Sequence, residues 1–297
     1  MKSSALVFVA LVGASVFAQE RGPVDLALAS VPPGAMRLPY GNDPLQFGEL
    51  RIPKTKGPHP VAIVVHGGCW LAQLGTFDPR AVALDNMRLL ANALTEAGIA
   101  TWNIEYRRLG DAGGGWPGSF QDVAAAADFI RTVAAREQLD LKRVISIGHS
   151  AGGHFALWLA GRHRIAKSSE LYSSTPLPLA GVVDLDGPGD LKATLPLQQP
   201  VCGSPVITNL IGGTPEQHPD RYRAASPIEL LPLGARQVFL AGRMFGAQGP
   251  AYEAAARKAG DAIQVSVSDS GHFVFIDPAS AMWPTVLKSV RSVLPPQ

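Results

Sequence analysis

One serine of the chain stands in a context that would make it a nucleophile. The segment GHSAGG at 148–153 fits the pattern G-x-S-x-G, follows the apolar run RVISI and precedes HFALWLAGRH, which has helical spacing. In such a strand–turn–helix the turn leaves no room for side chains at Gly148 and Gly152, and it lifts the serine hydroxyl clear of the sheet. The helix that follows favours developing negative charge at its N-terminus. Ser150 is therefore the predicted nucleophile, because a glycine-rich turn with an incidental serine would not need this order of elements.

The segment HGGCW at 66–70 supplies groups that would stabilise an oxyanion. It ends a continuous apolar run, and its two glycines allow backbone N–H groups to turn toward a reacting carbonyl. Together with the N–H of the residue after the nucleophile, such groups form an oxyanion hole. The predicted donors are Gly67, Gly68 and Ala151. Cys69 is an alternative donor, since the register of this loop cannot be read from the sequence.

A histidine follows the last predicted strand. In DSGHFVFIDP at 269–278, His272 occupies the place expected for the general base of a serine nucleophile, in the chain order serine, acid, histidine. The other histidines near the motifs are interpreted as structural: His66 holds its loop, His149 lies within the turn and His154 starts the helix. No spacing of His, Cys, Asp and Glu suggests a metal site.

The segments that carry these motifs alternate between strand and helix patterns. Predicted strands lie at 45–54, 59–68, 99–107, 142–150, 179–187, 237–242 and 262–272, and predicted helices at 80–98, 120–138, 151–163, 251–260 and 281–294. Such alternation implies an α/β fold, a parallel sheet with helices on both faces. Residues 187–234 interrupt it with many prolines and no long periodic helix. We expect this segment to be an insert over the carboxyl ends of the strands, where such sheets place their sites.

The first 18 residues resemble a secretory signal. Lys2 precedes an apolar run from Ala5 to Phe17 that is too short to span a bilayer comfortably, and the residues before the expected cut after Ala18 are ones that a signal peptidase accepts. The alternative is a membrane-anchoring helix. We expect an exported protein, periplasmic or secreted, with no membrane contact after signal removal. The predicted organisation is a signal peptide at 1–18, a lead-in segment at 19–37 and one catalytic domain at 38–297.

The composition excludes other classes of protein. Of the 297 residues, 46% are hydrophobic and 17% are charged, which fills a large core and argues against disorder. The net charge of +2, without a cluster of Lys and Arg, gives no reason to expect a nucleic-acid partner. The two cysteines, Cys69 and Cys202, are compatible with two free thiols or with a disulfide in an exported protein. We predict that they pair.

The motifs together resemble a known superfamily. HGGCW, GHSAGGH, SGHF and the ASP at 225–227 are similar to motifs of the α/β-hydrolases, in the branch of carboxylesterases and bifunctional deacetylase/feruloyl-esterase-like proteins. The HGGxW form also resembles that of kynurenine formamidase. The resemblance covers about residues 38–295. It implies an eight-stranded, mostly parallel sheet, an acyl-serine intermediate and no cofactor.

The resemblance also implies an aspartate after the strand QVFLAG, in the pattern G-x-x-D, but this chain has Phe245 there. Some lipases carry the acid at the end of the preceding strand, in a pattern similar to LDG followed by Pro, which here points to Asp186. The alternatives are Asp190, Glu253, or a serine–histidine pair that works without an acid. We predict that a carboxyl oxygen of Asp186 approaches His272 and that Phe245 makes no polar contact with it.

The sequence thus predicts an exported serine hydrolase that cleaves a small-molecule carboxylic ester, with Ser150, His272 and Asp186 as its catalytic residues. Two alternatives remain open: an amide hydrolase of the formamidase type, and a catalytically weak or inactive binding protein. The residues that select the acyl and alcohol groups are expected within 187–234 and around Trp70 and Trp116. No pattern in the sequence indicates the oligomeric state.

Overall fold

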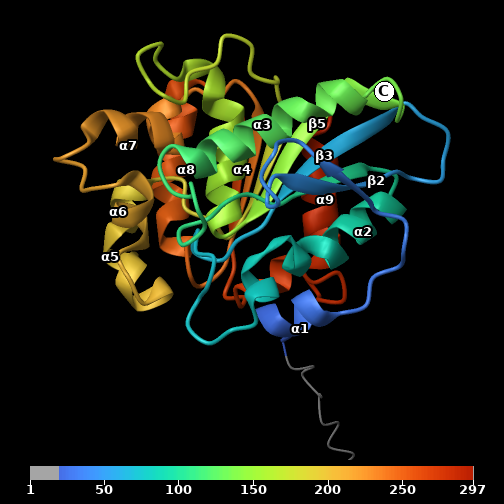
Figure 1. The fold of residues 1–297 in the computed structure, drawn as a ribbon, viewed down its shortest axis with the longest axis horizontal. Coiled ribbons are helices and arrows are strands. Elements are labelled where there is room, and N and C mark those ends of the chain that lie inside the picture. Colours follow the sequence, from blue (N-terminus) through green and yellow to red (C-terminus); the bar gives the residue numbers. More distant parts are fainter. Residues whose placement is uncertain (1–19, 297) are drawn as a thin grey trace, which may run out of the picture.

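The computed structural model describes residues 20–296, so the predicted signal peptide at 1–18 lies outside the described residues. Eight strands form one sheet in the order β1-β2-β4-β3-β5-β6-β7-β8 (Figure 1). The strands are β1 (Met36–Pro39), β2 (Phe47–Arg51), β3 (His59–Val65), β4 (Ala100–Ile104), β5 (Leu139–His149), β6 (Gly181–Leu185), β7 (Arg236–Ala241) and β8 (Ile263–Val267).

The sheet is parallel except at one edge. β2 is antiparallel to both β1 and β4, and the six strands β3 to β8 run parallel to one another. The expected eight-stranded, mostly parallel sheet is therefore confirmed. Every residue of β3 and of β6 is buried. Such uninterrupted apolar strands are typical of a sheet that is covered by helices on both faces.

Two layers of helices provide this cover (Figure 1). α3, α4 and α8 share one hydrophobic core with the sheet, and α1, α2 and α9 share a second core on its other face. α5, α6 and α7 lie together at one end of the molecule. The helices are α1 (Pro23–Leu28), α2 (Arg88–Glu96), α3 (Gly118–Val133), α4 (Ala151–Gly161), α5 (Leu191–Cys202), α6 (Val206–Ile211), α7 (Pro219–Ala225), α8 (Gly249–Ala259) and α9 (Trp283–Val293).

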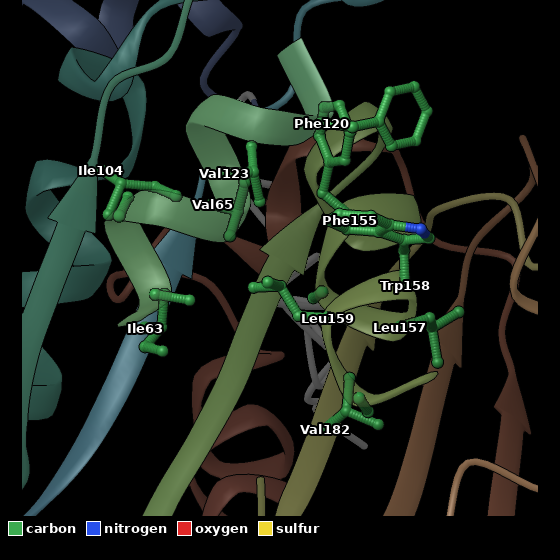
Figure 2. Close-up of a cluster of buried hydrophobic side chains, with 14 of the residues drawn as sticks. Ile63, Val65, Ile104, Phe120, Val123, Phe155, Leu157, Trp158, Leu159 and Val182 are labelled. Atoms are coloured by element: carbon green, nitrogen blue, oxygen red, sulfur yellow. The ribbon is translucent and has the colours of Figure 1, made fainter. Parts of the chain in front are cut away.

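α4 is the central helix of the first layer. All its residues are buried, as expected for a helix that is apolar on every side. Figure 2 shows Phe155 and Trp158 of α4 beside Phe120 of α3. The Phe120 ring centroid is 5.1 Å from each of the other two ring centroids, and both pairs are close to edge-to-face. This packing holds α4 in place, and with it the turn that enters the helix.

The structure differs from the sequence expectation near α2. The helix predicted over 80–98 is interrupted, because Pro79–Val82 and Leu84–Met87 form 3-10 turns and the α-helix begins only at Arg88. Side chains from elsewhere bind the carbonyls that a continuous helix would need. Arg108 donates to the Val82 carbonyl and Asn103 donates to the Leu84 carbonyl.

The insert at 187–234 also differs from expectation, since it contains the 12-residue helix α5. Pro196 and Pro200 lie inside α5, and each lacks a backbone N–H, so the sequence suggested a break there. The helix forms because Asp190 caps it, accepting hydrogen bonds from the N–H groups of Lys192 and Ala193. Its last residue is fastened to the body of the protein by a disulfide, described below.

Candidate active site

Ser150 lies on the turn between β5 and α4. Its backbone has φ 55° and ψ −123°, a region that residues other than glycine rarely adopt. The turn tolerates no side chains at its glycines. A Cβ at Gly148 would lie 2.0 Å from the Gly152 carbonyl oxygen, and one at Gly152 would lie 2.1 Å from the Val65 carbonyl oxygen. The expected strand–turn–helix is therefore present, and it holds Ser150 in a strained conformation above the sheet.

His272 and Asp186 meet next to this turn. His272 follows β8, and its Nδ1 lies 2.6 Å from Oδ2 of Asp186. Asp186 follows β6, the strand that pairs with the nucleophile strand β5. Its carboxylate is fully buried, and the His272 side chain is 11% exposed. The contact predicted from the LDG pattern is thus present, in a position where it orients the imidazole.

The loop after β7, which has Phe245 where an aspartate was expected, holds Asp186 in place through backbone hydrogen bonds. Its Oδ1 accepts hydrogen bonds from the backbone N–H groups of Gly242, at 2.8 Å, and Phe245, at 3.1 Å. Its own N–H donates to the Leu240 carbonyl oxygen at 2.7 Å. The Phe245 ring centroid is 6.1 Å from that of His272, and Phe245 makes no polar contact with it in the described chain. The loop after β7 therefore contributes two donors to the acid in place of a carboxylate.

The two reserve candidates for the acid have other roles. Asp190 caps α5, as described above. Glu253 lies on α8 and pairs with Arg257 one turn later, at 2.7 Å. Neither carboxylate contacts His272, so the structure singles out Asp186 among the acids considered from the sequence.

The HGGCW loop turns sharply beside Ser150. Gly68, Cys69 and Trp70 all have positive φ, at 107°, 55° and 57°. A Cβ on Gly67 would lie 3.0 Å from the Ser150 Cβ, so only glycine allows this close approach. The backbone N–H groups of Gly68 and Cys69 have no acceptor among residues 20–296. They are therefore available to an external oxygen, as is the N–H in the first turn of α4, at Ala151.

His66 fixes this loop from behind, the structural role predicted for it. Its Nδ1 lies 2.8 Å from the Gly67 carbonyl oxygen, and its Nε2 lies 2.9 Å from Oε1 of Glu105. The ring stacks on Tyr106 at a centroid distance of 4.3 Å. Burial alone would raise the pKa of Glu105, but the adjacent His66 and Arg108 bring it below its ordinary value. The glutamate is thus a charged anchor under this loop.

His149 is a site residue that sequence reasoning missed. Its ring packs on the His272 ring with centroids 4.3 Å apart, and its Nε2 lies 2.9 Å from the His272 carbonyl oxygen. Burial, together with the proximity of His272, lowers the pKa of His149 well below its ordinary value. The ring is therefore neutral and its proton is on Nε2, which donates to that carbonyl. Its place next to Ser150 in the chain was the only available signal, because ring contacts arise from tertiary packing.

Asp184 is a second buried acid below the turn. Its carboxyl is fully buried, and a Cβ on Gly153 or Gly187 would lie 2.0 Å or 2.5 Å from its Oδ1. Burial, reinforced by the charge of Asp186, raises the pKa of Asp184 well above its ordinary value. The folded chain therefore holds the Asp184 proton more tightly than the unfolded chain does. The carboxyl supports the turn from below, while Asp186 is the carboxylate that contacts His272.

Ser150 and His272 line the same cavity, of about 150 Å³. In the described chain no hydrogen bond joins the serine hydroxyl to the imidazole. Such contacts are commonly long in the absence of substrate and tighten when it binds. The structure thus brings together Ser150, His272, Asp186 and the N–H groups of Gly68, Cys69 and Ala151 at the carboxyl ends of the strands. Gly67, the remaining predicted donor, lines neither cavity beside Ser150, and Cys69, the alternative donor, lines both.

The two cysteines form the predicted disulfide. Cys69 of the HGGCW loop, called the oxyanion loop below, is joined to Cys202 at the end of α5, with the Cα atoms 5.9 Å apart. The bridge connects the insert directly to the loop beside Ser150. Trp70 lines a small cavity at Ser150, as expected for a residue near the substrate. Trp116 instead lines a separate cavity of about 550 Å³ that Ser150 does not reach.

No group of three or more His, Cys, Asp and Glu side chains among residues 20–296 is arranged to hold a metal ion. None of the helices in this part of the chain is long and apolar enough to cross a bilayer.

Comparison with known proteins agrees with this architecture. Residues 50–241, more than half of the chain, match the BD-FAE family. No curated protein matches the chain.

Several solved structures are similar to the chain. Esterase B from Lactobacillus rhamnosis has a TM-score of 0.70 at 20% identity, over 89% of this chain and 86% of its own. A truncated carbohydrate esterase from gut microbiota has a TM-score of 0.69 at 20% identity, over 92% and 99%. A bifunctional GH43-CE protein of Bacteroides eggerthii has a TM-score of 0.68 at 23% identity over 86% of this chain, which spans only 37% of that protein. At these identities the likeness establishes a shared fold.

Proposed function

Because the chain belongs to the BD-FAE family of α/β-hydrolase-like proteins, we propose that it is a serine esterase that cleaves carboxylic esters through an acyl-serine intermediate. The observation that carries the proposal is the 2.6 Å contact between Asp186 Oδ2 and His272 Nδ1, beside a strained Ser150 that lines the same cavity as His272. The similar solved structures include an esterase and a carbohydrate esterase, which supports the choice of an ester substrate.

The first half of the reaction follows from the tautomer of His272. A carboxylate accepts hydrogen bonds and cannot donate them. His272 Nδ1, which contacts Asp186, therefore carries the ring proton, and Nε2 is free to act as a base. Nε2 takes the proton of Ser150 as its Oγ attacks the ester carbon. The imidazolium that forms is stabilised by the Asp186 charge, which the N–H groups of Gly242 and Phe245 keep in place.

The negative charge moves to the former carbonyl oxygen of the ester. The free N–H groups of Gly68, Cys69 and Ala151 are the donors beside Ser150, and one such donor is typically worth about 3–4 kcal/mol of the barrier. His272 then returns its proton to the leaving alcohol oxygen, and the carbon–oxygen bond of the ester breaks. In the second half, His272 takes a proton from a water molecule as its oxygen adds to the acyl carbon. The bond between the acyl carbon and Ser150 Oγ then breaks, His272 returns the proton to Oγ, and the carboxylic acid leaves.

The proposal is tested by Ser150→Ala with a fluorophosphonate probe and p-nitrophenyl acetate. We expect the native chain to be labelled and to turn over the ester, and the variant to do neither while it unfolds at an unchanged temperature. Ser146→Ala is the matched control, since it removes a buried serine of the same strand whose hydroxyl donates to the Ala156 carbonyl. Ester turnover by Ser150→Ala within about tenfold of the native rate would contradict the nucleophile assignment.

The competing account is a binding protein without activity. The reason to consider it is that Phe245 stands where the superfamily pattern has an aspartate. The contact of Asp186 with His272 supports the active enzyme instead. An amide hydrolase of the formamidase type uses the same groups, and no contact in the site favours it over an esterase.

We also propose that the protein is exported and that its signal peptide is removed after Ala18. The Cys69–Cys202 bridge supports this, since disulfides persist in oxidising compartments. Arg21, three residues after the proposed cleavage site, donates a hydrogen bond to Asp277 at 2.8 Å and so contacts the folded domain. The intact mass of protein purified from its native host tests the proposal. A chain that retains residues 1–18 in the membrane fraction would favour the anchoring helix.

A further inference from the structure

Two cavities of unequal size meet at Ser150. The larger one, here called the open cavity, measures about 150 Å³ and is lined by Phe77, Met244 and His272 among others. The smaller one, here called the closed cavity, measures about 20 Å³. Its walls are almost wholly apolar and include Trp70, Leu197, Val201, Ile207 and Phe245.

Proton transfer decides which cavity holds which part of an ester. In the tetrahedral intermediate, His272 must give its proton to the leaving oxygen, so the alcohol part lies on the side of His272. His272 lines the open cavity and is absent from the closed one. The oxyanion donors lie between the two cavities, since Ala151 lines the closed one, Gly68 the open one and Cys69 both, so the position of His272 decides the assignment. The acyl group therefore projects into the closed cavity, and the alcohol leaves through the open one.

We propose that Phe245, with the walls supplied by the insert, restricts this enzyme to very short acyl groups, of which acetyl fits best. The inference rests on the proposed serine esterase function. A cavity needs about 10–15 Å³ of this volume to hold one water. The closed cavity, at about 20 Å³, thus holds one group of roughly methyl size beyond the acyl carbon. A butyryl or longer chain, or an aromatic acyl group such as a cinnamoyl, does not fit.

The walls of the closed cavity are fastened, so they do not yield easily to a longer chain. Phe245 is 5% exposed, and its backbone is bound to Asp186 through its N–H. Val206 and Ile207 are fully buried. The Cys69–Cys202 bridge ties the end of α5 to the oxyanion loop on the opposite side of the cavity. Forcing additional methylenes into such a packed site displaces side chains and is unfavourable.

The position of the acid explains why an apolar ring is available here. Residue 245 is the place where an acid was expected, and Asp186 occupies that role from the neighbouring strand end. Phe245 therefore serves the site in two ways. Its N–H orients the acid, and its side chain closes the acyl side of Ser150. Because the first role belongs to the backbone, a side-chain substitution separates the two.

The test compares kcat/KM for p-nitrophenyl acetate, butyrate and hexanoate in the native enzyme and in Phe245→Ala. We expect the native enzyme to prefer acetate over hexanoate by at least about tenfold, since one methylene in a tight pocket changes kcat/KM by roughly 10–200-fold. In Phe245→Ala this preference should fall by about tenfold or more, because the N–H that holds Asp186 is retained and the wall is removed. Phe77→Ala is the matched control, since Phe77 lines only the alcohol side and is 45% exposed. It should leave the acetate-to-hexanoate ratio within about twofold of native.

The outcomes separate the inference from the function on which it rests. Native enzyme that cleaves hexanoate as fast as acetate overturns the inference and leaves the esterase proposal intact, as does a Phe245→Ala variant with an unchanged ratio. Absence of turnover and of fluorophosphonate labelling in the native chain overturns both. If Phe245→Ala does not fold, Phe245→Leu and Ile207→Ala enlarge the same cavity, since both residues line it. A ratio unchanged in both would likewise overturn the inference.

Discussion

Replacing Asp186 with asparagine tests the site at the point where the sequence left alternatives open. In the native chain Oδ1 accepts from two backbone N–H groups, and Oδ2 accepts from His272 Nδ1. An asparagine must place its oxygen against the two N–H donors, so its NH₂ group faces Nδ1. An amide NH₂ group donates hydrogen bonds and cannot accept one from the Nδ1–H group. Nδ1 then becomes the acceptor, the ring proton moves to Nε2, and Nε2 can no longer take a proton from Ser150.

The expected loss follows from this inverted tautomer. In other triads the same substitution lowers turnover by about 10⁴-fold, and we expect a loss of about 10³–10⁴ here, or about 4 to 5.5 kcal/mol of the barrier. Folding should be retained, because asparagine fills the same volume and keeps both backbone hydrogen bonds. The affinity for substrate should change little, since Asp186 is fully buried behind His272.

The assay is kcat and KM for p-nitrophenyl acetate, together with thermal unfolding. Asp190→Asn is the matched control, since it makes the same chemical change at the cap of α5, where asparagine serves as well as aspartate. Its turnover should stay near native. A loss of less than about tenfold in Asp186→Asn would refute the reasoning and leave Asp186 as a structural acid only.

Two further predictions concern stability. Replacing both Cys69 and Cys202 with serine should lower the free energy of unfolding in urea by about 3–5 kcal/mol, because the bridge closes a separation of 133 residues, and an unchanged urea midpoint would contradict this. Asp184→Asn should stabilise the protein, because burial raises the pKa of Asp184 well above its ordinary value of 3.8. As the pH rises, the unfolded chain loses the Asp184 proton before the folded chain does. The contribution of Asp184 to native stability is therefore complete below about pH 3.8 and declines above it. The advantage of Asp184→Asn should therefore grow as the pH rises above about 4 in urea titrations at a series of pH values, and a difference that does not change with pH would contradict the raised pKa.

The parts of the site that sequence predicted are those with local causes. Ser150 was identified because a tight turn between an apolar strand and an apolar helix needs glycines at 148 and 152. The strand, the glycines and the helix are adjacent in the chain, so the sequence alone shows this pattern. The sheet followed from the alternation of buried strands and helices. The contact of Asp186 with His272 was predicted less directly, from the LDG pattern at a strand end, because the sequence has several acidic residues near that edge of the sheet.

The parts that sequence could not predict depend on contacts between distant segments. β1 is a short edge strand with little burial, so no periodic pattern marks it. α5 contains two prolines, and its last residue is held by a disulfide to Cys69, which is 133 residues away in the chain. The contact of His149 with His272 joins the last residue of β5 to a residue in the loop after β8. In each case the deciding interaction has no counterpart in the neighbouring residues of the chain.

The hydrogen bonds from the loop after β7 to Asp186 have a consequence for how this protein can diverge. Position 245 must supply an N–H to the acid but not any particular side chain. Proline is the one residue that lacks this donor, so it is the substitution that the chemistry forbids there. Every other residue leaves the acid in place and alters only the space beside the serine. Proteins with this arrangement can therefore change their acyl specificity through substitutions at position 245 alone, without an inactive intermediate.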